Sequence, residues 1–279
     1  MAKPKTETFE GAGGTEIHLK WWAPRRVRST KGMVVISHGG GEHSGRYQHV
    51  ADRLNSAGYG VYALDHRGHG ESGGKRGMID RMHNATADVK HVVGMAREKA
   101  GEDKPVFLLC HSLGGCIALD YALGNPGDLD GLVLSAPLAK LDAANPVQLG
   151  APRIVSVVAP GTAVFKVDSS TISRDEAVVE AYDEDPLVLH KGLPARTISE
   201  VAGSIRGFKT RLPKMEVPLL VMVGDSDRLV PPDAGRMVEE LAGSEDKEII
   251  EYHDLYHEIL NEPEQGQVMD DLVDWLDQH

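Results

Sequence analysis

The strongest constraint on the fold is a series of six short, mostly apolar runs, each bounded by glycine, proline or polar residues. Runs of this kind are typical of strands that are buried on both faces of a parallel sheet. They are MVVIS (33–37), YGVYAL (59–64), VFLLC (106–110), GLVLSA (131–136), PLLVMVG (218–224) and EIIEY (248–252). A further, half-buried strand is expected at 17–21, where apolar and polar residues alternate.

Helical patterns separate several of these runs. Two apolar stripes have the spacing of one helix face: Val89, Val92, Val93 and Ala96, and Val268, Met269, Leu272, Val273 and Leu276. Strands that alternate with helices predict an α/β fold, with a mostly parallel central sheet flanked by helices on both sides.

The alternation is interrupted once, by residues 138–215, which carry helical signals but no strong strand run. One signal is a capping box, Ser173-Arg-Asp-Glu176, which predicts the start of a helix. We therefore predict a core domain made of residues 1–137 and 216–279, and a mainly helical insertion, 138–215, that covers one end of the sheet as a cap. The alternative is a second packed helical subdomain with no gating role.

Composition limits the partners and the compartment. The formal net charge of -12 argues against nucleic acid, because neutralising phosphates requires clustered Lys and Arg. Residues 1–23 lack the apolar core of a signal peptide, and the uncharged stretch 154–165 is too short to span a bilayer. Cys110 and Cys116 match no zinc motif and are too few for a disulfide framework. We expect a soluble, cytoplasmic protein with free thiols.

The segment VFLLCHSLGGCIAL (106–119) places a serine between a predicted strand and a predicted helix. A nucleophile elbow of the type G-x-S-x-G would hold Ser112 on a strained turn, whose neighbours must be small. Gly114 meets that requirement, Gly115 lets the helix pack close to the sheet, and Cys110 replaces the first glycine of the pattern. The alternative is a serine that only caps a helix, so the interpretation depends on the partners of Ser112.

A serine nucleophile needs a histidine base that is itself held by a carboxylate. In sheets with this elbow the three residues follow in the chain order Ser, Asp, His. Asp225 and Asp227 follow one of the last two predicted strands, and His253 and His257 follow the other, at the sheet edge where α/β proteins bind ligands. We favour Asp227 and His257, which lie deeper in their loops, over Asp225 and His253.

Acyl transfer also needs N–H donors for the oxyanion that forms. The predicted strand 33–37 leads into His38-Gly39-Gly40-Gly41, which fits an HGGG element with a backbone N–H facing the nucleophile. The second N–H is expected from Leu113, the residue after the serine. A merely flexible glycine loop is the alternative.

Two competing motifs fail on inspection. GHGESGGKR (68–76) is loosely similar to a phosphate loop, but His69 and Arg76 stand where Gly and Ser or Thr are required. His257 and Glu258 begin like a zinc-protease helix, but Asn261 replaces the second histidine. We therefore expect no metal, nucleotide or other cofactor.

With these residues in place, the chain resembles the monoacylglycerol lipase family of serine α/β-hydrolases. The matching segments are HGGGEHSGRY (38–47), LDHRGHGES (64–72), HSLGG (111–115), SRDEAVVEAYDEDPL (173–187), GDSDRL (224–229) and YHEILNEP (256–263), spread over nearly the whole chain. The resemblance implies the α/β-hydrolase fold with a helical cap that guards an apolar acyl tunnel. It also implies a catalytic triad of Ser112, Asp227 and His257, with the backbone N–H groups of Gly40 and Leu113 as oxyanion donors.

The resemblance suggests three further residues for substrate binding. Tyr182 would face the glycerol end of the substrate from the cap, and Glu42 and Arg46 would be polar pocket residues. The alternatives are a tyrosine that packs on the core and a local ion pair at helical spacing. The matching turn at 65–72 is expected to be a structural, hydrogen-bonded loop.

The sequence thus predicts an esterase that cleaves monoacylglycerols to fatty acid and glycerol through an acyl-enzyme on Ser112. A lysophospholipase, a general carboxylesterase and, more distantly, a catalytically silent ligand receptor are the alternatives. The uncharged stretch 154–165 is expected to contact lipid surfaces transiently, so that substrate enters without crossing water. It would otherwise form the core of the cap itself. Oligomeric state is left open.

Overall fold

The computed structural model describes residues 3–24, 30–140 and 151–279, without the side chains of residues 151–154. The first part of the predicted insertion, residues 141–150, therefore lies outside the described residues. Within the described part of the chain, no helix is both long enough and apolar enough to cross a membrane.

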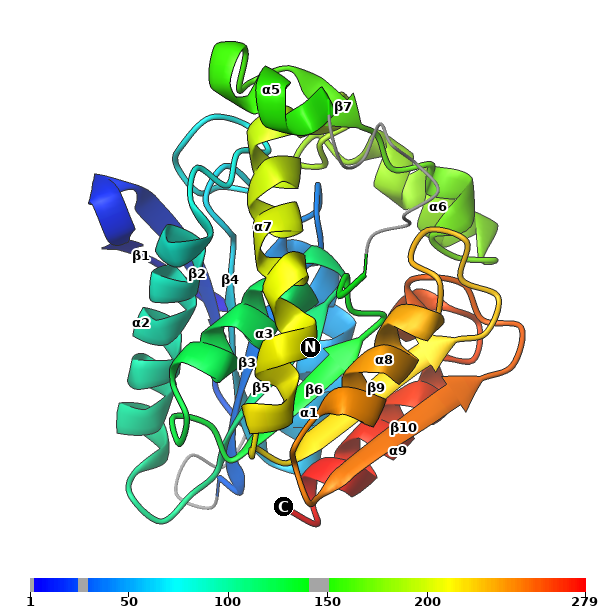
Figure 1. Ribbon diagram of the computed structural model, residues 1–279. Coiled ribbons are helices and arrows are strands. Elements are labelled where there is room, and N and C mark those ends of the chain that lie inside the picture. Colours follow the sequence, from blue (N-terminus) through cyan, green and yellow to red (C-terminus); the bar gives the residue numbers. More distant parts are fainter. Residues whose placement is uncertain (1–2, 25–29, 141–150) are drawn as a thin grey trace.

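An eight-stranded sheet forms the centre of the molecule, in the order β1-β2-β4-β3-β5-β6-β9-β10 (Figure 1). Neighbouring strands from β4 to β10 in that order are parallel, and β1 and β2 join antiparallel at one edge. The strands are β1 (Lys5–Glu10), β2 (Glu16–Trp22), β3 (Gly32–Ser37), β4 (Tyr59–Leu64), β5 (Val106–His111), β6 (Gly131–Ser135), β9 (Leu219–Gly224) and β10 (Lys247–Tyr252). All six apolar runs are strands, so the predicted mostly parallel α/β fold is confirmed.

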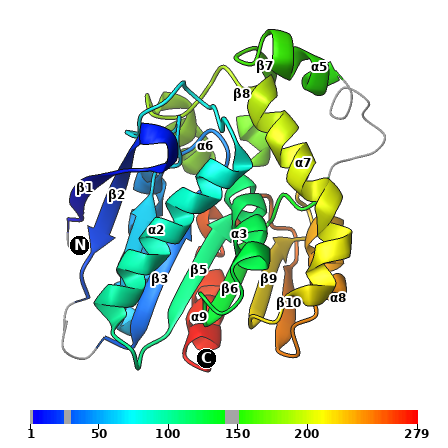
Figure 2. The same ribbon diagram turned by 60° about the vertical axis from the view of Figure 1, so that its left-hand side comes forward.

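The central strands send alternate side chains into two helical layers. In β5, Leu108 and Cys110 belong to one apolar cluster, and Phe107 and Leu109 belong to the other. Helices α2, α3, α7 and α8 cover the first face, and α1 and α9 cover the second (Figures 1 and 2). The helices are α1 (Gln48–Ala57), α2 (Met82–Ala100), α3 (Leu113–Gly124), α5 (Ala151–Val158), α6 (Glu176–Glu184), α7 (Ala195–Arg211), α8 (Asp233–Leu241) and α9 (Gln265–Leu276). The two predicted apolar stripes lie in α2 and α9 and are buried.

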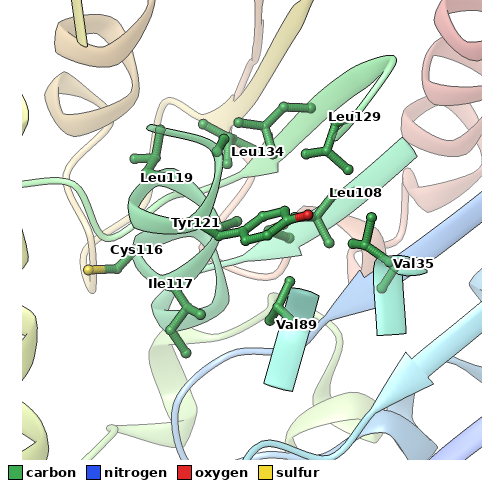
Figure 3. Close-up of a cluster of buried hydrophobic side chains, with 14 of the residues drawn as sticks. Val35, Val89, Leu108, Cys116, Ile117, Leu119, Tyr121, Leu129 and Leu134 are labelled. Carbon is green, nitrogen blue, oxygen red and sulfur yellow. The ribbon is translucent and has the colours of Figure 1, made fainter. Parts of the chain in front are cut away.

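Helix α3 is embedded in the first of these layers. Its side chains Ile117 and Tyr121 lie beside Leu108 of β5 and Val89 of α2, all four fully buried (Figure 3). Burial of such side chains is worth about 1.5–3 kcal/mol each. Because α3 begins directly after Ser112, this packing fixes the turn at Ser112 relative to the sheet.

Two strand predictions were wrong in detail. The alternation at 17–21 predicted an exposed His18, but this side chain is 8% exposed, since it packs against the loop that contains Asp65. The run EIIEY is not buried on both faces, because β10 is the edge strand and leaves Glu248 and Glu251 exposed. Strand β1 is mostly exposed and carries no apolar pattern that could have predicted it.

The insertion contains α5, β7 (Ala163–Phe165), α6, β8 (Leu193–Pro194) and α7. Strands β7 and β8 form a small antiparallel pair, too short to give a sequence signal. Helix α7 runs from the β7–β8 pair towards the sheet (Figure 2), where Val201 and Phe208 join the apolar cluster of the sheet. One end of the insertion therefore packs as part of the core.

The predicted capping box was wrong by two residues. Helix α6 begins at Glu176 with Asp175 as its N-cap, and Asp175 Oδ1 accepts a hydrogen bond of 2.9 Å from the Ala177 N–H. Ser173 instead donates its hydroxyl to the Asn261 carbonyl, 3.0 Å away, and accepts from the Asp175 N–H. The Ser173 side chain, which the local pattern predicted to cap the helix, is thus bonded to the core instead.

Candidate active site

Ser112 lies on a strained turn between β5 and α3. Its φ of 50° and ψ of -115° fall outside the regions that non-glycine residues adopt without strain. A Cβ at Gly114 would lie 2.2 Å from the Ser37 carbonyl oxygen and 2.5 Å from that of His38. As far as the described contacts go, Ser112 makes no capping hydrogen bond to α3. The geometry is that of a nucleophile elbow rather than of a capping serine.

Cys110, which departs from the usual glycine, points into the apolar core. It is 1% exposed and does not line the cavity beside Ser112. Burial raises the pKa of its thiol, and burial also raises the pKa of the equally buried Cys116. The two thiols flank Ser112 in the sequence, but both behave as small core residues.

Asp227 and His257 form a buried hydrogen-bonded pair. His257 Nδ1 lies 2.7 Å from Asp227 Oδ2, while Asp227 Oδ1 accepts from the N–H groups of Leu229 and Val230 at 2.8 and 2.9 Å. Burial alone would lower the pKa of His257, but the charge and hydrogen bond of Asp227 outweigh it and raise that pKa. His257 and Ser112 both line the same cavity, so the pair stands beside the elbow.

The competing residues pair with each other elsewhere. Asp225 Oδ2 lies 2.9 Å from Nδ1 of His253, whose side chain is 86% exposed. Of these four candidate residues, His257 is the one that lines the cavity.

His111, next to Ser112, was not singled out from the sequence. Its ring stacks at an angle on that of His257, with 4.6 Å between centroids. Burial, and then the neighbouring charge of His257, lowers the pKa of His111 to about 4. The His111 imidazole is therefore neutral at neutral pH, so that of the two rings His257 is the one that binds a proton more readily.

The glycine loop after β3 is held in one conformation. His38 Nδ1 donates to the Gly39 carbonyl at 2.7 Å, and His38 Nε2 accepts from the His66 N–H at 2.9 Å. Glu42 Oε1 accepts the Gly39 N–H at 2.6 Å. No described residue accepts a hydrogen bond from the Gly40 N–H, which belongs to a residue packed against Leu113. The loop is ordered by its partners rather than flexible.

A cavity of about 280 Å³ opens beside Ser112. Its apolar wall comes largely from the insertion and includes Val164, Phe165, Val167, Ile172, Leu193, Ile198 and Val201. The core contributes the polar groups, which include Glu42, Ser112, His257 and Glu258. One long apolar wall and one polar end suit an amphipathic ligand.

A buried ionic network closes the polar end. Arg46 Nη1 donates to Glu42 at 2.8 Å and to Glu258 at 2.6 Å, and Arg46 Nη2 donates to Glu258 at 2.7 Å. The guanidinium carbon of Arg46 lies 4.9 Å from the ring centre of Tyr182. Of the three predicted substrate residues, Glu42 and Tyr182 line the cavity and Arg46 lies behind that lining. Glu258 was missed, because its partner Arg46 is 212 positions away in the sequence.

Burial raises the pKa of the Glu42 carboxyl, but Arg46 and then His111 and His38 more than offset this and bring the pKa to about 2. Glu42 is therefore ionised at neutral pH. The pKa of Tyr182 is raised by burial and next by the charges of Glu258 and Glu42. The polar end is thus a region of negative charge.

The turn at 65–72 is a structural loop, as expected. Ser72 Oγ donates to the Asp65 carbonyl at 2.6 Å and accepts from the His18 N–H at 2.8 Å. Arg67 Nε donates to the buried Asp88 at 2.9 Å. These bonds join the turn to β2 and α2, away from the cavity.

A strained serine elbow on an α/β sheet, beside a buried Asp–His pair, defines a serine hydrolase. A family model described as serine aminopeptidase, S33, matches residues 28–264. A monoacylglycerol lipase of Mycolicibacterium smegmatis is 40% identical, covering 98% of this chain and 96% of that protein. A phospholipase of Bacillus subtilis is 33% identical, covering 93% of this chain and 98% of that protein.

Solved structures agree with these relatives. The crystal structure of Paleococcus ferrophilus monoacylglycerol lipase is 30% identical, with a TM-score of 0.81, covering 99% of this chain and 98% of that one. This chain belongs to the monoacylglycerol lipase family of serine α/β-hydrolases. It is accordingly a carboxylic ester hydrolase with the α/β-hydrolase fold.

Proposed function

We propose that the protein hydrolyses monoacylglycerols to a free fatty acid and glycerol, with Ser112, His257 and Asp227 as its catalytic triad. The observation that carries the proposal is the buried Asp227–His257 pair, whose histidine lines the same cavity as the strained Ser112, a cavity with both apolar and polar lining. The chain's high similarity to a protein named monoacylglycerol lipase supports the same substrate.

In the proposed mechanism, His257 takes the proton of Ser112 as the serine oxygen attacks the ester carbonyl. The backbone N–H groups of Gly40 and Leu113 donate to the oxyanion, and loss of one such donor typically costs about 10²–10³ in rate. His257 then protonates the departing glycerol oxygen and activates a water that hydrolyses the acyl-enzyme. Asp227 holds the imidazole orientation and stabilises its charged form.

The two ends of the substrate have separate surroundings in this proposal. The acyl chain lies along the apolar wall contributed by the insertion. The insertion, residues 138–215, acts as a cap over the cavity. Tyr182 and Glu42 contact the glycerol end, and Arg46 supports them from behind through its bond to Glu42 and its stacking on Tyr182.

We further propose that the cap contacts lipid surfaces transiently. Val157 and Val158, at the end of α5, are 77% and 75% exposed, and they are the large hydrophobic side chains left exposed among the described residues. Among residues 155–158, whose side chains the structure describes, Ser156 is buried and Val155 is half-buried, so Val157 and Val158 are the side chains available for lipid. A cytoplasmic enzyme that binds membranes peripherally would gain direct access to its substrate.

Replacing both Val157 and Val158 with serine tests this contact. We expect weaker co-sedimentation with phosphatidylcholine vesicles and slower turnover of long-chain substrate, with unchanged turnover of a water-soluble short-chain ester. Unchanged vesicle binding and unchanged long-chain turnover would show that Val157 and Val158 do not contact the lipid surface.

A lysophospholipase activity is the second candidate, favoured by the similarity to a protein named phospholipase. Initial rates on monooleoylglycerol, dioleoylglycerol and 1-oleoyl-lysophosphatidylcholine, compared at equal detergent content, separate the candidates. The proposal expects the highest kcat/KM on monooleoylglycerol, and a preference for the lysophospholipid would replace it with the second candidate. Failure of a fluorophosphonate probe to label Ser112 would instead favour a silent receptor.

A further inference from the structure

Two carboxylates and one guanidinium meet at the polar end of the cavity. Glu258 follows His257 directly, is 5% exposed and lines the cavity together with Glu42. Both carboxylates accept from the same atom, Arg46 Nη1, so their oxygens lie close together. The cluster therefore carries one excess negative charge, beside the reacting groups.

The cation of this cluster is not available to a ligand. Three of the five N–H donors of Arg46 are committed to Glu42 and Glu258, and the residue lies behind the cavity lining. Tyr182 covers one face of its guanidinium. An anionic group in the cavity would therefore meet carboxylates first.

Lys140 is the lysine that lines the cavity among the described residues, and it is engaged elsewhere. Lys140 pairs with Asp233 of α8, and its side chain is 46% exposed. Asp233 follows the cavity-lining segment 229–231, so the Lys140–Asp233 ion pair lies on the side of the cavity formed by that segment. It does not offset the charge of Glu42 and Glu258.

The two carboxylates retain room for hydroxyl donors. A carboxylate oxygen accepts about two hydrogen bonds. Glu42 Oε1 already accepts from the Gly39 N–H and the Tyr47 hydroxyl, and Glu258 Oε2 accepts from Arg46 and Asn261. Among the described residues, Glu42 Oε2 and Glu258 Oε1 each accept one hydrogen bond, from Arg46 Nη1. Each oxygen therefore keeps a site that can accept a hydrogen bond from an alcohol hydroxyl. The negative charge of the two carboxylates repels a phosphate.

We propose that Glu258 is a specificity-determining residue, which selects esters with a neutral, hydroxyl-bearing headgroup and excludes esters whose headgroup carries a phosphate. Like-charge juxtaposition disfavours the phosphate-bearing ester, which separates the two substrate classes. The inference rests on the proposed function, because it concerns the headgroup of the same ester.

The test compares kcat/KM on monooleoylglycerol and on 1-oleoyl-lysophosphatidylglycerol in the same neutral detergent. We expect the wild type to prefer the neutral ester by at least about tenfold, and Glu258→Gln to narrow that ratio by about tenfold, since one like charge is removed. Glu248→Gln is the matched control, because it removes the same charge from an exposed position on β10. It should keep the wild-type ratio.

The outcomes separate the two proposals. A wild type without activity on monooleoylglycerol would overturn the proposed function. A wild type that cleaves it, with the same ratio in Glu258→Gln as in Glu248→Gln, would overturn the role of Glu258 alone.

A second measurement needs no variant and covers the case in which Glu258→Gln does not fold. An unhydrolysable ether, 1-O-octadecenylglycerol, and its 3-phosphate are compared as competitive inhibitors of the wild type. The neutral ether should have the lower inhibition constant by at least about tenfold. A smaller difference would overturn the inference.

Discussion

Gly114 is the position at which the elbow has least room. The carbonyl oxygens of Ser37 and His38 surround the place where a side chain would begin. Gly94, in the middle of α2, has nothing within 4 Å of the same place and is a matched control.

We expect Gly114→Ala to lower the free energy of unfolding by about 1–3 kcal/mol, because the backbone must move to admit the methyl group. Gly94→Ala should raise it by about 0.5–1 kcal/mol, since alanine favours a helix interior. Urea denaturation measures both changes. If Gly114→Ala were as stable as Gly94→Ala, the close packing described for the elbow would be wrong.

The pH dependence of kcat/KM reports on His257. The base must be neutral to accept the serine proton, so activity falls as pH drops through the pKa of His257. Because Asp227 raises that pKa, we expect the midpoint of the acid limb to lie above 6.5, the ordinary value for histidine. Asp227→Asn should reduce kcat by roughly 10⁴ and move the limb to lower pH, since burial is then opposed only by the weaker effects of Glu258 and Glu42 on the pKa of His257.

Asp225→Asn is the control for this profile, because Asp225 pairs with the exposed His253. It should leave both the midpoint and kcat nearly unchanged. A midpoint below 6.5 in the wild type, or a shift in Asp225→Asn equal to that in Asp227→Asn, would contradict the pairing of His257 with Asp227.

Sequence position predicted Asp227 and His257 as the partners of Ser112, because each lies in a loop at the carboxyl edge of the sheet, deeper than its competitor. It was not enough to find Glu258 or His111. Their environment is made by residues far apart in the chain, and no local spacing encodes such contacts.

At the scale of elements, the part of the insertion that contains α6 is bonded to the core. The Glu258 N–H donates to the Ile172 carbonyl at 2.8 Å, and the Leu189 N–H donates to the Gly41 carbonyl at 2.7 Å. Arg174 Nε donates to the fully buried Glu262 at 3.0 Å. We therefore expect any opening of the cavity to involve α5 and β7 rather than α6.

Arg174→Ala tests this fastening. It leaves the Glu262 carboxylate buried with only backbone donors, so we expect a loss of about 1–3 kcal/mol in unfolding free energy. Arg236→Ala breaks an ion pair of the same type with Glu251 on the surface, which should cost less than about 1 kcal/mol. Equal losses in the two variants would show that α6 is not specially anchored.

Elements with a strong periodic pattern were predictable from the sequence, and those defined by a partner were not. The buried strands and the stripes of α2 and α9 carry their own signal. Strands β7 and β8 exist because they pair with each other, and the start of α6 shifted because Ser173 bonds to Asn261. The local sequence contains neither partner.

At the scale of the whole molecule, the net charge of -12 governs how the protein meets a lipid surface. We expect weaker binding to vesicles with 30% phosphatidylglycerol than to pure phosphatidylcholine vesicles at low salt, because the acidic protein is repelled. The difference should shrink at 1 M salt, where the Debye length falls to about 3 Å. Tighter binding to the anionic vesicles would contradict this repulsion and would indicate a basic patch on the lipid-binding surface.

The central claim is that Ser112 attacks the ester of a monoacylglycerol. The most direct measurement is the release of fatty acid from monooleoylglycerol by the wild type, by Ser112→Ala and by Ser56→Ala, a control at an exposed position on α1. We expect about one glycerol per fatty acid with the wild type and Ser56→Ala, and a loss of at least about 10³-fold in rate with Ser112→Ala. Retention of activity in a folded Ser112→Ala protein would show that Ser112 is not the nucleophile.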